Sequence, residues 1–396
     1  MSTQNPVFIP GPTNMPDRVR FAMAGQTLDH RAPGFPDFQQ TLLDDLKKVF
    51  RTDAGRAITF PASGTGGWEA AITNTLSPGD TVLMARHGVF SGKWIELCGR
   101  HGLEVQVIDR PWGEAAPADA LGAALAADTD HKIKAVLVTH NETATGVVSD
   151  IGAIRRAMDA CAHPAMLFAD CVSSLASMPF EMDAWGVDIA VTGSQKGFML
   201  QTGMAIVAVS PKAFQAMETA TCTRGFFDFQ WMIENNDNGG YPYTPPMQLM
   251  QGLREALDML LEEGLEDVFA RHHRHAEAVR RAVAAWGLKT VAVSPDVASN
   301  TVTAIHLPEG FDSDALIGHA FNAYGVSYGA GLGQLQGRAF RIGHLGSLTE
   351  AMVLSGLATI EMAMADLAIP VRLGSGVAAA QAYYCAGGAK ALQTAA

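Results

Sequence analysis

The chain has 396 residues, of which 48% are hydrophobic and 17% are charged. This composition excludes an intrinsically disordered chain, because disorder requires low hydrophobicity and a high net charge. The formal net charge of −12 argues against a nucleic-acid or anionic-membrane partner, whose binding needs a basic surface. An anionic small substrate can still bind in a locally basic pocket. The length predicts two domains, or one large domain with a smaller partner.

Short apolar runs alternate with helix-like stretches from about residue 57 to residue 209. In the expected helix Thr65–Leu76, for example, Trp68, Ala71 and Ile72 share one face. This alternation predicts an α/β fold with a mostly parallel sheet covered on both faces, and a ligand site at the carboxyl ends of its strands. The expected strands are Ala57–Phe60, Thr81–Met84, Glu104–Ile108, Ala135–Thr139, Met166–Asp170, Ile189–Thr192 and Met204–Val209.

The second half of the chain predicts a smaller α+β unit. A constrained loop is expected over Asn235–Pro246, followed by a long helical stretch from Met247 to about Trp286. Ser347 and Glu350 have capping-box spacing and are expected to open a helix. The remaining elements of this unit are expected at Val302–His306, Ser313–Tyr324 and Ala339–Ile342.

Two other segments attract attention by composition. The run Arg271–His275 holds three histidines, but its arginines disfavour a bound cation, so a solvated helix face is expected. The glycine-rich stretch Gly329–Gly333 lacks the full dinucleotide fingerprint and is expected to be a mobile loop. The part after Gly374 is rich in Ala and Gly and predicts no particular structure.

The five cysteines are widely spaced and form no C-x-x-C pair, so neither a disulfide framework nor a zinc site is expected. A reducing cytosol fits this pattern. Residues 1–12 lack a signal-peptide pattern, and the apolar runs are too short to span a membrane. We therefore expect a cytoplasmic protein. The cysteines are Cys98, Cys161, Cys171, Cys222 and Cys385.

Two reactive side chains follow expected strands directly. Lys196 lies in a Gly-Ser-Gln-Lys-Gly turn. A desolvated lysine there would be a nucleophilic amine able to form a Schiff base, whereas an exposed turn is the alternative. Asp170 ends another strand, where its buried charge needs a partner such as a protonated pyridine nitrogen. A helix-capping or structural role is the alternative for Asp170.

Three more clusters offer groups that could bind a ligand. Small residues in Ser63–Gly67 precede a helix and could present backbone N–H groups to a phosphate, although the spacing fits no phosphate-loop fingerprint. Arg341 lies inside an apolar strand and suits bidentate capture of a carboxylate, or else an internal ion pair. The run Thr139–Gly146 adds several hydroxyls and a carboxylate at a strand end.

The order of these clusters resembles the class V aminotransferases of pyridoxal-phosphate (PLP) fold-type I, within them the serine-, alanine- and aspartate-glyoxylate branch. The resemblance covers about residues 6–367. It implies a large PLP-binding domain with a mostly parallel seven-stranded sheet and a smaller α+β C-terminal domain. The boundaries we expect are an N-terminal segment at 1–22, the large domain at 23–262, and the small domain with its tail at 263–396. The motifs are Pro10-Gly11-Pro12-Thr13, Ser63-Gly64-Thr65-Gly66, Thr139–Gly146, Asp170, Ser194-Gln195-Lys196-Gly197 and Arg341-Ile342-Gly343.

The resemblance also implies a role for each matching residue. Lys196 would bind the cofactor covalently and move the substrate α-proton, and Asp170 would pair with the pyridinium nitrogen. The phosphate would be held by Ser63, Gly64 and Thr65, with Gln195 beside them.

Further positions surround the cofactor ring and the substrate. Phe90 would stack on the ring, where relatives often have Trp or His, and Val172 would pack on the other face. Thr143 would hydrogen-bond the ring hydroxyl. The substrate would be bound by Gly11 and, at its α-carboxylate, by Arg341. The resemblance implies a homodimer or a dimer of dimers, in which Tyr241 and Thr244 reach the phosphate of the neighbouring subunit.

The implied reaction transfers the amino group of a small L-amino acid to glyoxylate and yields glycine. Serine or aspartate is the expected donor, and alanine is the alternative. An aspartate donor needs a second cation or hydrogen-bond donor, for which His30, Arg31 and His344 are available. A cysteine desulfurase-like activity is disfavoured because 329–337 holds no cysteine, and a nicotinamide-dependent dehydrogenase because the glycine fingerprint is incomplete. A non-catalytic PLP-binding protein is a third alternative. No metal is expected.

Overall fold

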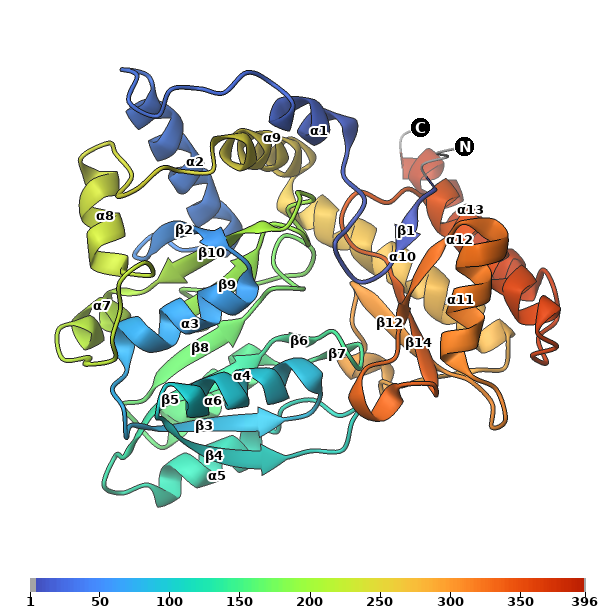
Figure 1. The fold of residues 1–396 in the computed structure, drawn as a ribbon. Coiled ribbons are helices and arrows are strands. Elements are labelled where there is room, and N and C mark those ends of the chain that lie inside the picture. Colours follow the sequence, from blue (N-terminus) through green and yellow to red (C-terminus); the bar gives the residue numbers. More distant parts are fainter. Residues whose placement is uncertain (1–4, 395–396) are drawn as a thin grey trace.

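A seven-stranded sheet forms the centre of the larger part of the molecule (Figure 1). The computed structural model describes residues 5–394, so the outermost ends of the predicted N-terminal segment and tail lie outside it. The strand order is β2-β10-β9-β8-β5-β3-β4, and every pair is parallel except the two made by β10. The strands are β2 (Arg56–Ala62), β3 (Thr81–Arg86), β4 (Glu104–Asp109), β5 (Ile133–Thr139), β8 (Met166–Asp170), β9 (Ile189–Gly193) and β10 (Gly203–Val209). The mostly parallel sheet is thus confirmed.

Successive side chains of each strand point to opposite faces of this sheet, and both faces are buried. In β5, Ala135 and Leu137 pack on one face, while Val136 and Val138 pack on the other. This explains why the strands are apolar throughout rather than alternating. The core on the face of Ala135 and Leu137 includes residues of α3 (Gly64–Thr75), α4 (Val89–Arg100), α7 (Pro211–Met217) and α8 (Phe229–Asp237). The core on the face of Val136 and Val138 includes residues of α2 (Phe35–Phe50), α5 (Ala118–Ala127), α6 (Ile151–Ala160) and α9 (Met247–Glu263).

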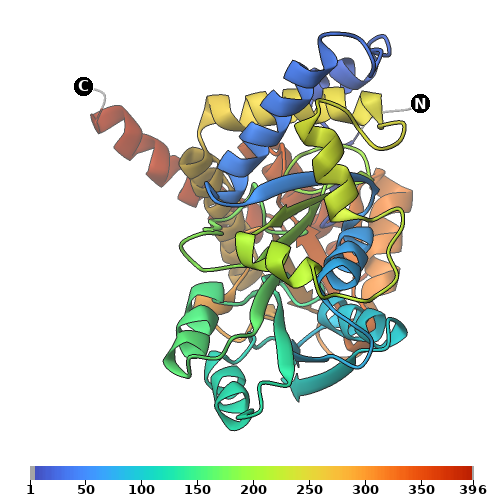
Figure 2. The ribbon, with the colours of Figure 1, turned by 90° about the vertical axis from the view of Figure 1, so that its left-hand side faces the viewer.

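The C-terminal part has its own sheet and its own core. Helices α10, α11 and α12 pack on that sheet, and α13 packs on α10 and α12 before its end projects from the body (Figure 2). The predicted boundary at residue 263 falls between α9 and α10 and stays a prediction. The sheet order is β1 (Val7–Phe8), β13 (Ser327–Ala330), β14 (Ala339–Gly343), β12 (Val302–His306) and β11 (Lys289–Thr290), and the helices are α10 (Leu265–Ala285), α11 (Ser313–Tyr324), α12 (Glu350–Asp366) and α13 (Ser375–Thr394).

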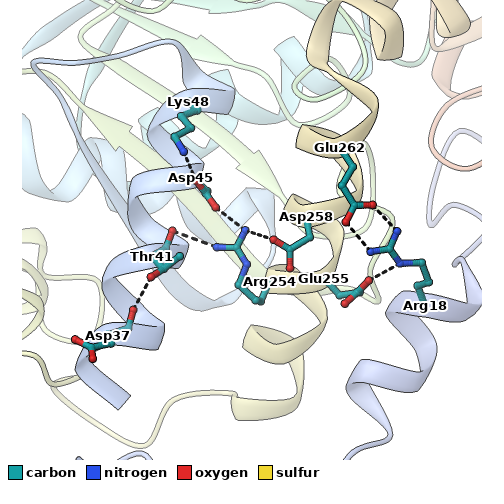
Figure 3. A network of polar contacts seen from close by, with 9 residues as sticks. All are labelled: Arg18, Asp37, Thr41, Asp45, Lys48, Arg254, Glu255, Asp258 and Glu262. Atoms are coloured by element: carbon teal, nitrogen blue, oxygen red, sulfur yellow. Dashed lines mark hydrogen bonds and ion pairs between the residues drawn. The ribbon is translucent and has the colours of Figure 1, made fainter. Parts of the chain in front are cut away.

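The N-terminal segment ties the two parts together. Its strand β1 pairs with β13 in the small sheet, and its helix α1 (Asp17–Met23) packs on α9 of the large part. Arg18 fixes α1 by ion pairs to Glu255 and Glu262, while Arg254 on the same helix α9 pairs with Asp45 of α2 (Figure 3). The chain between β1 and α1 is therefore held at both ends.

Several details of the second half differ from the sequence prediction. The stretch from Met247 to Trp286 is two helices, because Gly264 adopts a φ of 84° and breaks the chain direction between them. Thr349 rather than Ser347 caps α12, its side chain accepting a hydrogen bond from the Met352 amide. The stretch Gly329–Gly333 is not a loop throughout, since Gly329 and Ala330 belong to β13 and pair with β14.

The expected solvated face at Arg271–His275 is wrong for two of its histidines. His272 and His275 are 1% and 2% exposed, because α10 packs that side against α12 and α13. Burial lowers the pKa of His272 to about 3 and that of His275 to about 4.

Helix α8 also occupies the start of the predicted loop Asn235–Pro246. The short elements outside both sheets are the hairpin β6 (Asn141–Glu142) and β7 (Val147–Val148) and the 3₁₀ turns η1 (Pro295–Val297) and η2 (Gly333–Leu335).

Candidate active site

A cavity of about 140 Å³ opens at the carboxyl ends of the parallel strands β8, β5 and β3, where ligands bind in sheets of this kind. Loops after five different strands contribute to its wall, so the site exists only when the sheet is assembled. The lining residues are Ser63, Gly64, Thr65, Trp68, Phe90, Thr143, Asp170, Val172, Ser173, Gln195 and Lys196. The structure thereby brings together the predicted cofactor-binding residues, apart from Tyr241 and Thr244.

Lys196 is buried in a turn that follows β9, so the exposed-turn alternative is excluded. Its ammonium nitrogen donates a hydrogen bond to the carbonyl of Pro10 in the N-terminal segment. Burial and, to a smaller extent, the nearby charge of Arg341 lower the pKa of Lys196, Asp170 partly opposes them, and the resulting pKa is about 8. A lysine with such a pKa holds an appreciable uncharged fraction near neutral pH and can act as a nucleophile and as a base.

Asp170 ends β8 inside the cavity and is almost fully buried. One carboxylate oxygen accepts a hydrogen bond of 3.0 Å from the Val172 amide. No ion pair with Asp170 forms among the described residues. Burial raises the pKa of this carboxyl to about 7, and the Val172 hydrogen bond only partly opposes the rise. A buried carboxylate of this kind is stabilised by a cationic ligand group.

The opposite end of the cavity suits an anion. Ser63 is the N-cap of α3, yet its side chain makes no capping hydrogen bond, and the first N–H groups of the helix have no intrahelical partner. Gln195 lies beside them in the lining of the cavity. A Cβ at Gly64 would overlap the Val172 side chain, so a glycine is required where α3 approaches the opposite wall.

The remaining walls are formed by side chains from three loops. Phe90 comes from the first turn of α4, and Val172 and Ser173 follow Asp170. The Thr143 hydroxyl, from the β6–β7 hairpin, donates a hydrogen bond of 2.7 Å to the Ser173 hydroxyl. Phe90 and Val172 thus give the cavity two apolar sides, and the hydroxyls of Thr143 and Ser173 line a third side. Such a space suits a flat aromatic ring with one polar substituent.

Arg341 lies close to the cavity but outside its lining. It is 7% exposed on β14, with hydrogen bonds to the carbonyl oxygens of Ala330 (2.8 Å) and Thr143 (3.1 Å). No acidic side chain forms an ion pair with it within residues 5–394, so the internal ion-pair alternative fails. Burial lowers the pKa of this guanidinium to about 10, and it remains a cation at neutral pH. A buried cation without an anion is suited to bind an anionic ligand.

The segment between β1 and α1 covers Lys196. The Thr13 amide donates to the Gln195 carbonyl at 3.2 Å, and the Thr13 hydroxyl donates to the Lys196 carbonyl at 3.2 Å. Gly11 has a φ of 107°, and a Cβ at that position would overlap the Lys196 side chain. The N-terminal segment can therefore approach the lysine this closely only because residue 11 is glycine.

Tyr241 and Thr244 do not join the cavity of their own chain. The Tyr241 hydroxyl donates a hydrogen bond of 2.6 Å to the carbonyl of Thr59 on β2, and Thr244 is exposed. Of the residues considered for a donor side chain, His344 is fully buried, and both of its ring nitrogens are bonded, to Asn300 and Thr303. His30 and Arg31 lie on the surface segment before α2.

The sequence assigns no individual role in the site to three residues of this region. Trp68 and Ser173 line the cavity, and Glu142 lies fully buried beside Phe90. The sequence predicts Trp68 on the core face of its helix, which is correct, and the same side chain also reaches the cavity. Glu142 belongs to the polar run Thr139–Gly146, and its contacts across the fold carry no local sequence signal.

Within residues 5–394, no group of three or more histidine, cysteine or acidic side chains is arranged to hold a metal ion. In the same range no helix combines the length and the apolar character that crossing a membrane requires.

The chain was compared with known proteins. The family model "Aminotransferase class-V" matches residues 30–335. The chain is 58% identical over 384 residues to the L-aspartate–glyoxylate aminotransferase of Paracoccus denitrificans, covering 97% of both chains. It is 52% identical over 380 residues to the serine–glyoxylate aminotransferase of Hyphomicrobium methylovorum, covering 96% of this chain and 94% of the relative.

The fold comparison agrees with these matches. The crystal structure of pyridoxamine–pyruvate aminotransferase from Mesorhizobium loti superposes with a TM-score of 0.89 at 30% identity, covering 98% of this chain and 99% of that one. The likeness therefore extends over almost the whole chain.

Proposed function

The chain belongs to the class V aminotransferase family, and on that premise we propose that it transfers the amino group of a small L-amino acid to glyoxylate, giving glycine and the matching 2-oxo acid. The family implies pyridoxal 5′-phosphate as cofactor. One observation carries the proposal: a single buried cavity holds a lysine of lowered pKa, a carboxylate of raised pKa and a free helix N-terminus.

These three features match the three chemical parts of the cofactor. The phosphate would lie at the N-terminus of α3, on the amides and hydroxyls of Ser63, Gly64 and Thr65, with Gln195 beside it. The ring would lie between Phe90 and Val172, with Thr143 at its hydroxyl. When bound, the cofactor supplies the electron sink that makes the substrate α-proton removable.

The protein residues position the substrate and move protons. Asp170 would keep the ring nitrogen protonated, because a buried carboxylate near a cation gains a partner for its charge. Lys196 would carry the cofactor and, once displaced by the substrate amine, hold and return the α-proton. Arg341 would bind the substrate carboxylate and Gly11 would line the substrate space, so that the α-carbon is held against Lys196 and not in solvent.

We expect aspartate as the amino donor, with serine as the second candidate. Relatives with these two named activities are 58% and 52% identical to the chain. Both donors have polar side chains, so equal turnover of alanine would contradict this choice. A cysteine desulfurase-like activity is disfavoured, because residues 329–337 hold no cysteine and Cys385 lies on α13.

The proposal extends to assembly and location. We expect a homodimer, in which Tyr241 and Thr244 approach the phosphate site of the neighbouring subunit. That arrangement agrees with their absence from the cavity of their own chain. We also expect the protein to act in the cytoplasm.

An absorbance titration tests the proposal. The purified protein is titrated with single amino acids in the absence of an acceptor, with Lys196→Ala measured alongside. We expect a visible cofactor band that aspartate or serine bleaches and glyoxylate restores, and that Lys196→Ala lacks. A protein that shows no band even after pyridoxal 5′-phosphate is added would overturn the proposed function.

A further inference from the structure

Glu142 is a fully buried acidic residue that the proposed reaction does not use. Its side chain is 0% exposed and forms no ion pair within the described chain. Its carboxylate instead accepts hydrogen bonds from the amides of Phe90 (3.0 Å), Ser91 (2.9 Å) and Ala144 (3.1 Å), and from the Ser91 hydroxyl (3.1 Å). A buried carboxylate is costly unless such donors surround it.

These donors belong to two separate walls of the cavity. The amides of Phe90 and Ser91 lie in the first turn of α4, whose partial positive charge favours a carboxylate. The Ala144 amide belongs to the hairpin turn that carries Thr143. Glu142 therefore joins the wall expected to stack on the cofactor ring to the wall expected to bind the ring hydroxyl.

The approach of α4 to this carboxylate is close. Gly88 precedes the helix with a φ of 176°, an extended conformation that any residue can adopt. A Cβ at Gly88 would nevertheless overlap the Glu142 carboxylate. The glycine is thus required by the position of the carboxylate and not by the backbone.

We propose that Glu142 is a positioning residue, which sets the distance and tilt of Phe90 relative to Thr143 and so shapes the slot for the cofactor ring. It acts through these two residues and does not itself line the cavity. The inference rests on the proposed PLP-dependent function, because that function supplies the ring.

An amide cannot replace this carboxylate. In Glu142→Gln one oxygen becomes an NH₂ group, which cannot accept from N–H donors. At least one of the donors on α4 or the hairpin would lose its partner inside the protein, and the two walls would separate to relieve the conflict.

The chain contains a matched control in Glu361. This carboxylate is 1% exposed and also accepts from four donors, here all N–H groups, those of Trp286 (2.6 Å), Gly374 (2.7 Å), Gly376 (2.6 Å) and Val377 (3.3 Å). It lies in the small C-terminal part. Glu361→Gln therefore imposes the same chemical change on a buried carboxylate that has no connection with the cofactor slot.

The experiment uses full-length wild type, Glu142→Gln and Glu361→Gln, each titrated with pyridoxal 5′-phosphate. Two quantities are measured: the dissociation constant, and the visible circular dichroism of the bound cofactor at saturation, which reports ring orientation at equal occupancy. We expect Glu142→Gln to weaken binding about tenfold and to change the dichroism per bound cofactor. Glu361→Gln should lower the melting temperature and leave both quantities unchanged.

Gly88→Ala provides a second variant that retains every polar group and displaces the carboxylate only by contact. It should change the dichroism in the same direction as Glu142→Gln. The positioning role is overturned if wild type binds the cofactor and both variants keep its affinity and dichroism, or if Glu361→Gln alters them equally. A wild-type protein that binds no cofactor would instead overturn the proposed function.

Discussion

Replacing Asp170 by Asn should make the cofactor-free protein more stable at alkaline pH. Burial raises the pKa of this carboxyl to about 7 from an ordinary value of 3.8. The folded protein therefore holds a proton between these two pH values that the unfolded chain has already released. The contribution of this group to the free energy of unfolding is therefore largest below pH 3.8, and it is lost as pH rises toward 7.

The magnitude follows from the width of that window. Each pH unit within it costs the folded state about 1.4 kcal/mol, so at pH 8 the ionised carboxylate costs on the order of 4 kcal/mol. Asn removes the charge and keeps an oxygen that can accept from the Val172 amide. The variant should thus exceed wild type in stability at pH 8 by a few kcal/mol, with little difference near pH 4.

Urea unfolding of cofactor-free wild type and Asp170→Asn at pH 5 and pH 8 measures this difference. The contributions of the other titrating groups are common to both proteins and cancel when the two are compared. With the cofactor bound the order should reverse, since only the carboxylate gains a cationic partner. A cofactor-free Asp170→Asn protein that is less stable than wild type at pH 8, or a difference that does not change with pH, would refute the argument.

Three other changes have defined outcomes. Gly11→Ala places a methyl group against Lys196 at a φ of 107° and should lower kcat by about tenfold or more; an unchanged steady-state rate would contradict the close approach. Arg341→Lys removes the planar fork while keeping the charge, and should raise the KM of the amino donor about tenfold with a smaller change in kcat; equal effects on both constants would count against carboxylate binding. His272 has a pKa lowered to about 3 by burial, so stability is lost as pH falls below 6.5, by about 1.4 kcal/mol per pH unit. His272→Gln should reduce that slope in urea unfolding between pH 6.5 and pH 5, and an unchanged slope would contradict the assignment.

Local sequence determined the strands of the large sheet and the site residues that follow them. Apolar runs such as Met166–Asp170 are buried on both faces, so their composition alone predicts a strand inside a covered sheet. Asp170 and Lys196 were predictable because each directly follows such a run, and the carboxyl ends of parallel strands meet at one edge. The burial of Arg341 followed in the same way from its position within an apolar strand.

Tertiary structure decided which alternative held at each of these residues. Whether Lys196 was an exposed turn residue depended on Pro10, almost two hundred positions earlier, which covers it. The burial of His272 and His275 depends on helices that follow much later in the chain. A polar composition on α10 predicts solvent exposure, and only packing against α12 and α13 reverses it.

The same reason explains why Glu142 was overlooked. Its partners Phe90 and Ser91 lie about fifty residues away, and a single glutamate in a polar loop is more often a solvated surface residue. Local patterns were enough to predict most of the element types, the strand-end site and the order of its motifs, because each of these depends on a few neighbouring residues. The charge states of the buried residues and the placement of the cavity walls depend on the tertiary structure, because both are set by side chains that are distant in the sequence. The desolvation that shifts a pKa, for example, depends on everything packed around the side chain.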